Sequence, residues 1–87
     1  MSADQKGNWA IFYSKIDEPT EWKTMRYQRS DGVLVSAKTY DDVYKFTRFK
    51  EAYDFVKKLI TEDHPTYNAS VKRVCRTRGE GFYLSGN

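Results

Sequence analysis

The chain has 87 residues, a formal net charge of +3, and 39% hydrophobic and 16% aromatic residues. This length predicts one domain with a thin core, and the aromatic content excludes a disordered tail. One cysteine, Cys75, excludes an intramolecular disulfide, and the first residues contain no apolar run typical of a signal peptide. No stretch approaches the roughly 20 apolar residues of a membrane span, so we expect a cytoplasmic protein that makes no membrane contact.

The first expected element is a strand. We expect residues 1–7 to be a disordered lead-in and residues 8–87 to form a single α+β domain. The lead-in is followed by the run NWAIFYSKI, whose aromatic and β-branched residues are typical of a strand. Because side chains alternate along a strand, Trp9, Ile11 and Tyr13 should share one face.

A hairpin is expected next. Residues 22–29 show the alternating side-chain pattern of a strand and lead into Ser30-Asp31-Gly32. An Asp-Gly pair is typical of a tight turn, because glycine adopts positive φ without cost. Residues 33–38 should form the returning strand. Residues 39–42 are expected to be a polar turn, and residues 43–46 a short fourth strand.

The clearest helical pattern runs from about Arg48 to Thr61, where apolar residues recur at helical spacing. Thr47 is the expected N-cap, because its hydroxyl can accept a hydrogen bond from a free backbone N–H. Phe55 lies off the apolar stripe, so we expect it to be partly exposed. The remaining expected elements are a strand, a turn and a short final strand at residues 70–76, 77–81 and 82–84.

This order of elements, β-β-β-(β)-α-β-β, predicts an α+β fold. The expected arrangement is an antiparallel sheet of four to six strands with one helix packed on one face. Because one helix covers only one face, the other face should meet solvent or a partner.

The sequence contains no catalytic or metal-binding set. One histidine, His64, and one cysteine cannot supply the ligands of a zinc site. The carboxylate pairs Asp17-Glu18 and Asp41-Asp42 fall in expected turns, where neighbouring side chains point apart. The five glycines are scattered and form no phosphate-binding loop. We therefore expect a binding protein without a cofactor or metal, not an enzyme.

Positive charge is concentrated in the second half of the chain. Residues 1–43 contain six Lys/Arg and seven Asp/Glu, whereas residues 44–87 contain nine Lys/Arg and five Asp/Glu. A basic half favours phosphate-bearing or acidic partners. Guanidinium groups suit phosphate oxygens, and nearby aromatic rings can stack on unpaired bases. The residues predicted to bind RNA or another single-stranded nucleic acid are Lys72, Arg73, Arg76, Arg78, Phe82 and Tyr83, with Lys57 and Lys58 from the helix.

Two other interpretations of these features stay open. Alternation places Lys72 and Arg76 on one strand face and Arg73 on the other, and charge on an edge strand can simply prevent aggregation. A protein interface is the alternative function, because exposed aromatic residues with arginine are typical anchors. Its candidate residues are Trp9, Tyr13, Trp22 and Arg26, unless both tryptophans belong to the core. The protein partner could instead bind an edge strand of the sheet. A further alternative is a homodimer that binds a small nucleotide.

The segments NWAIFYSKI and VYKFTRFKEAYDFVKKL, the second at residues 43–59, resemble the small accessory proteins of tailed bacteriophages. The resemblance implies a β-meander that runs into a helix and a non-enzymatic inhibitor of a host process or defence system. Such inhibitors bind a host protein or RNA, and some act on toxin–antitoxin ribonucleases. No motif accompanies the resemblance, so it assigns no functional residue.

Overall fold

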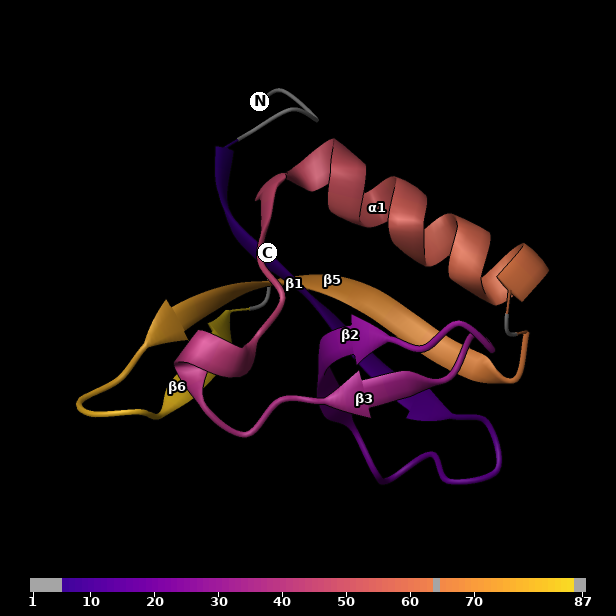
Figure 1. Ribbon diagram of the computed structural model, residues 1–87, viewed down its shortest axis with the longest axis horizontal. Coiled ribbons are helices and arrows are strands. Elements are labelled where there is room, and N and C mark those ends of the chain that lie inside the picture. The colour runs from indigo at the N-terminus through magenta and orange to yellow at the C-terminus, as the bar shows by residue number, and fades with distance from the viewer. Residues whose placement is uncertain (1–5, 64, 86–87) are drawn as a thin grey trace.

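The computed structural model of the protein describes residues 6–63 and 65–85, and it has the predicted α+β fold (Figure 1). An antiparallel sheet carries one helix packed on one face. The elements are β1 (Lys6–Lys15), β2 (Lys23–Gln28), β3 (Leu34–Ser36), the 3-10 helix η1 (Tyr40–Asp42), β4 (Phe46–Arg48), α1 (Phe49–Lys58), the π-helical turn η2 (Leu59–Asp63), β5 (Tyr67–Arg76) and β6 (Phe82–Ser85). None of the described helices is long and apolar enough to cross a membrane.

Strand β1 organises the sheet, whose order is β3-β2-β1-β5-β6, with β4 also paired to β1. One edge of β1 pairs along its length with β5, where Ile11 lies opposite Val71. The other edge is divided: Phe12 pairs with Thr24 of β2, and Trp9 pairs with Phe46 of β4. The sheet is therefore split on this side, between β2 and β4.

The starts of the first strand and of the helix differ from the predictions. β1 begins at Lys6, so the predicted lead-in is wrong for Lys6 and Gly7, and residues 1–5 lie outside the described residues. The helix begins at Phe49 after Arg48, whose backbone is extended and whose side chain makes no capping bond. Thr47 belongs to β4, so the predicted N-cap is wrong.

The predicted hairpin turn is confirmed between β2 and β3, which pair in antiparallel fashion. Gly32 has a φ of 89°, a conformation that residues with a side chain rarely adopt. The backbone N–H of Val33 donates to Asp31 Oδ1 at 3.2 Å, which fixes the turn locally.

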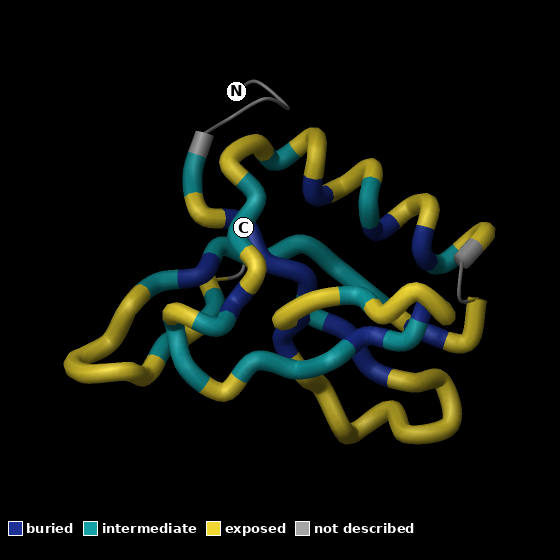
Figure 2. Tube along the Cα trace, viewed as in Figure 1, coloured by how far each residue is buried: buried dark blue, intermediate teal, exposed yellow. Residues whose placement is uncertain are grey.

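The main core lies between α1 and the sheet (Figure 2). The predicted alternation is confirmed, because Trp9, Ile11 and Tyr13 are all buried on the side of the helix. Each buried aromatic or aliphatic side chain contributes roughly 1.5–3 kcal/mol through the area that it removes from water. The helix contributes Ala52, Val56 and Leu59, and other segments contribute Met25, Leu34 and Tyr67.

A second, smaller core lies on the opposite face of the sheet. Its buried residues are Ala10, Val43 and Val74, and Tyr40 of η1 packs against them. The segment predicted as a polar turn, residues 39–42, thus contains the 3-10 helix η1 at Tyr40–Asp42, and Tyr40 covers part of this face.

A buried hydrogen bond joins β5 to β3 beneath the helix. The backbone N–H of Leu34 donates to the Tyr67 hydroxyl at 3.2 Å. Replacing Tyr67 with Phe should leave this buried N–H without an acceptor and lower the free energy of unfolding by about 1–3 kcal/mol. Urea titration of the Tyr67→Phe variant tests this. Tyr44→Phe is the control, because the Tyr44 ring is half exposed. Equal midpoints for the two variants would contradict the assigned role of the Tyr67 hydroxyl.

Candidate functional site

The predicted basic cluster is divided between the two faces of the sheet. Lys72 lies opposite Ala10, on the face turned away from α1, whereas Arg73 lies opposite Trp9 on the helix side. The Arg73 guanidinium stacks on the Trp9 ring, with 4.7 Å between the guanidinium carbon and the ring centroid. The alternation that builds the strand therefore prevents neighbouring cations from forming one surface.

Arg76 has partners within the chain. Its guanidinium lies 2.8 Å from Asp41 Oδ1 and 4.9 Å from the centroid of the Tyr40 ring. Both charged side chains are exposed, so this ion pair contributes little to stability. Its effect is local: it neutralises Arg76 and attaches β5 to η1.

The other residues predicted to bind nucleic acid are also dispersed. Arg78 is exposed in the turn between β5 and β6. Phe82 is half-buried against the second core, whereas Tyr83 is 55% exposed and lies opposite Cys75. A hydrogen bond with the Cys75 side chain raises the pKa of Tyr83. Lys57 and Lys58 end the helix, far from the β5–β6 hairpin (Figure 1).

The residues of the predicted protein interface separate as well. Trp9 and Tyr13 are each only 4% exposed, so both are core residues and the prediction that they form a docking surface is wrong. Trp22 is 41% exposed, and its ring stacks on that of Phe12 at 4.9 Å. Arg26 is exposed and lies 3.8 Å from Asp42.

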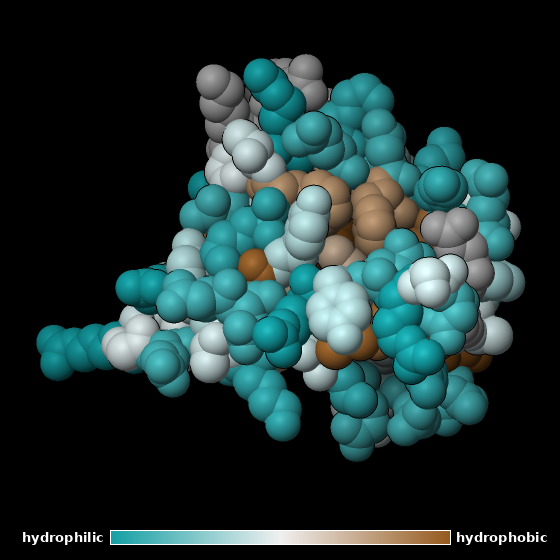
Figure 3. Space-filling view, viewed as in Figure 1, coloured by the Kyte–Doolittle hydropathy of each residue, from teal (hydrophilic) through white to brown (hydrophobic). Residues whose placement is uncertain are grey.

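An apolar hollow lies where the sheet is split. Figure 3 shows apolar atoms gathered between α1 and the β2–β3 hairpin. The hollow has a volume of about 270 Å³ and is here named the aromatic groove. It is lined by Met25, Tyr27, Gln28, Tyr44, Phe46 and Phe55.

Three separate segments hold the rings of the aromatic groove in place. The Tyr44 and Phe46 rings lie 4.8 Å apart, and Phe46 lies 5.5 Å from Phe55 of α1. The backbone N–H of Tyr44 donates to the carbonyl of Met25 at 3.1 Å, and this bond joins the segment of Tyr44 and Phe46 to β2. Tyr27 and Tyr44 remain 48% and 50% exposed. The groove is thus anchored on the core and open at its rim.

One signal in the sequence pointed toward this groove. Phe55 was predicted to lie off the apolar stripe and to be partly exposed, and the structure confirms it. Its neighbours in the groove were not predicted, because Tyr27 and Tyr44 reach it only through the split between β2 and β4.

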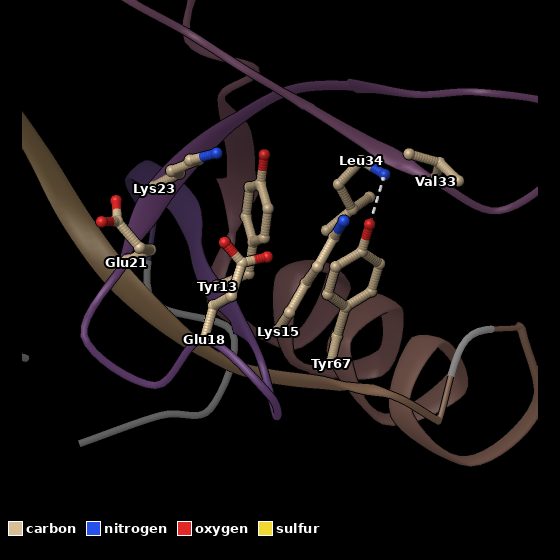
Figure 4. Close-up of a pocket in the computed structure, with 8 residues that line it drawn as sticks. All are labelled: Tyr13, Lys15, Glu18, Glu21, Lys23, Val33, Leu34 and Tyr67. Atoms are coloured by element: carbon tan, nitrogen blue, oxygen red, sulfur yellow. Dashed lines mark hydrogen bonds between the residues drawn. The ribbon is translucent and has the colours of Figure 1, made fainter.

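A second, smaller cavity of about 120 Å³ lies at the end of β1 (Figure 4). The Tyr13 and Tyr67 rings stand side by side in it, and its charged lining residues are Lys15, Glu18, Glu21 and Lys23. Burial, with a smaller effect of Tyr67, raises the pKa of Tyr13 to about 12, so its hydroxyl stays protonated even above the ordinary tyrosine pKa of 10.0. This volume is well below the roughly 300–1,000 Å³ of small-molecule sites, so the cavity does not suit a nucleotide.

Among the described residues, no three or more His, Cys, Asp or Glu side chains come together in a way that could hold a metal ion. His64 lies outside the described residues. The aromatic groove brings four aromatic rings together around one hollow, and two of these rings are half exposed, which makes it the candidate functional site. Comparisons of the chain with known protein families, curated proteins and solved structures found no match.

Proposed function

We propose that the protein is a non-enzymatic binding domain that receives an apolar side chain of a partner protein in the aromatic groove. The observation that carries the proposal is the groove's lining: two half-exposed tyrosines and two phenylalanines surround about 270 Å³ of open space. Tyrosine and phenylalanine are enriched in the centres of protein interfaces, where they form the pockets that receive anchor residues.

The size and chemistry of the groove favour a side chain over a free ligand. Its volume lies just below the range of small-molecule sites and is sufficient for one large aromatic or aliphatic side chain. Met25 at its floor is 2% exposed, so an occupant would contact the core directly. The Tyr27 and Tyr44 hydroxyls can hydrogen-bond to the partner's backbone around the buried contact.

Nucleic-acid binding is the second candidate, and the arrangement of the cations gives it less support. Phosphate binding gains from several cations on one surface, but Lys72 and Arg73 lie on opposite faces, and Arg76 is paired with Asp41. In keeping with the resemblance to phage accessory proteins, we propose that the bound partner is inhibited because its own contact surface is occupied.

Parallel selections can test the proposal. The immobilised protein is offered a random peptide display library and, separately, a random RNA pool. We expect peptides with an aromatic or large aliphatic anchor to be enriched. Replacing Tyr27 with Ala should weaken their binding by about tenfold or more, as at other interface hot spots. Tyr83→Ala is the matched control, because Tyr83 is exposed to a similar extent but lies on the β5–β6 hairpin.

The competing results are distinct. RNA ligands that depend on Arg73 and Arg78, bind more weakly in salt and ignore Tyr27→Ala would assign the protein to nucleic-acid binding and overturn the proposal. Peptides that bind the Tyr27 and Tyr83 variants equally well, or no enrichment in the peptide library, would overturn it too.

A further inference from the structure

The outer edge of β5 is unpaired over half of the strand. β6 pairs with Arg73–Arg76 and ends at Ser85, opposite Arg73. No other described strand pairs with the remaining outer edge, Asn68–Lys72, here named the β5 edge. An open edge is a template on which another strand can form backbone hydrogen bonds.

The direction of the free backbone groups follows from the bonds that flank this edge. The N–H of Ile16 donates to the carbonyl of Thr66 at 2.8 Å, so even-numbered residues of β5 direct their backbone groups toward β1. The N–H of Thr77 donates to the carbonyl of Gly81 at 3.1 Å, so odd-numbered residues direct theirs toward β6. Ala69 and Val71 therefore point their N–H and C=O groups outward, where they have no partner in the described part of the chain.

We infer that the β5 edge pairs with the β5 edge of a second copy of this chain, which makes a two-fold symmetric homodimer with one continuous sheet. Antiparallel pairing about an axis at Ala69 brings outward-pointing residues opposite one another. Ala69 then faces Ala69 of the second copy, and Asn68 faces its Ser70. No like charges lie directly opposite each other in this register.

The position of α1 supports a second copy as the occupant. The helix packs over β1 and β5, and neighbouring strands lie about 4.8 Å apart. Edge-to-edge pairing would therefore place the two helices about 10 Å apart, close to the roughly 8–10 Å of packed helices. An extended peptide would fill the strand position but would leave the adjoining flank of the helix uncovered.

The flank of α1 that would meet the second helix carries an exposed ring. Phe55 faces the aromatic groove, so Tyr53, two residues earlier, lies on the opposite side of the helix. Tyr53 is 52% exposed and continues the ring contacts of the core, since it stacks on Phe49, which in turn contacts Trp9. The homodimer would bury Tyr53 and leave both aromatic grooves open, on the far flanks of the two helices.

Sedimentation equilibrium over a concentration series tests the homodimer. Two copies of equal net charge repel, so added salt should strengthen the association, opposite to the effect expected for an acidic or nucleic-acid partner. Val71→Pro removes one outward N–H that no described strand uses, and the dimer dissociation constant should rise about tenfold or more. The Val71 side chain also packs against the main core, so circular dichroism checks that the variant is folded. Tyr53→Ala should weaken the dimer similarly, and Tyr83→Ala is the matched control.

Amide hydrogen exchange gives a residue-level readout. The Ala69 and Val71 amides should exchange more slowly as the protein concentration rises, whereas the exposed Arg78 amide in the turn should not. A protein that stays monomeric at millimolar concentration in high salt would overturn the inference. A dimer that Tyr53→Ala and Val71→Pro both leave unchanged would overturn it as well, because its interface would lie elsewhere.

Discussion

Replacing Leu59 with Ala is expected to lower the free energy of unfolding by about 2–5 kcal/mol. Leu59 is 0% exposed at the junction of α1 and η2, within the core between the helix and the sheet. The loss combines the transfer energy of the deleted atoms with the cost of the cavity that they leave. A domain of this size has a total stability of only about 4–13 kcal/mol, so the change would remove much of it.

Urea or thermal unfolding measures this effect, and Lys57→Ala on the exposed side of the same helix is the control. The control should change stability by less than about 0.5 kcal/mol. If Leu59→Ala were as mild as Lys57→Ala, the assignment of Leu59 to the centre of the core would be wrong.

The second large effect is expected in alkaline solution. Burial and the neighbouring Tyr67 raise the pKa of Tyr13 from 10.0 to about 12. Between these values the unfolded chain releases the phenolic proton but the folded chain retains it. The folded state therefore binds more protons, and stability falls as pH rises. The slope is about 1.4 kcal/mol per pH unit, which amounts to about 2–3 kcal/mol across the interval.

The contribution of Tyr13 is fully present below pH 10 and is lost as pH rises toward 12. Lysines and the other tyrosines also titrate here, so the informative quantity is the difference between the wild type and Tyr13→Phe. We expect the phenylalanine variant to lose less stability than the wild type between pH 10 and 12. Tyr53→Phe, which changes an exposed ring, should follow the wild type. Parallel curves for all three proteins would contradict the raised pKa.

Local patterns were sufficient to predict most of the fold. The alternation of Trp9, Ile11 and Tyr13 predicted a strand with one buried face, and the Asp31-Gly32 pair predicted the hairpin. Both signals depend on neighbours within a few residues. The predicted N-cap at Thr47 failed because β4 runs directly into α1, and pairing with β1 outweighs a local capping preference.

The candidate site depends on contacts that no local pattern contains. The aromatic groove joins Tyr27, Tyr44 and Phe55, which belong to three segments and meet only because β2 and β4 share one edge of β1. The basic segment shows the reverse case. Its cations are adjacent in sequence, but alternation separates Arg73 from Lys72, and Arg76 meets Asp41 from a distant turn.

The central position of β1 also affects how the chain reaches its structure. β1 makes its longest pairing with β5, near the other end of the chain, so the two strands must meet before either face of the sheet can be completed. Such distant pairing raises the contact order, and proteins with high contact order fold slowly because a long loop must close first. During synthesis, β1 and the β2–β3 hairpin leave the ribosome well before β5 and stay incomplete until β5 follows.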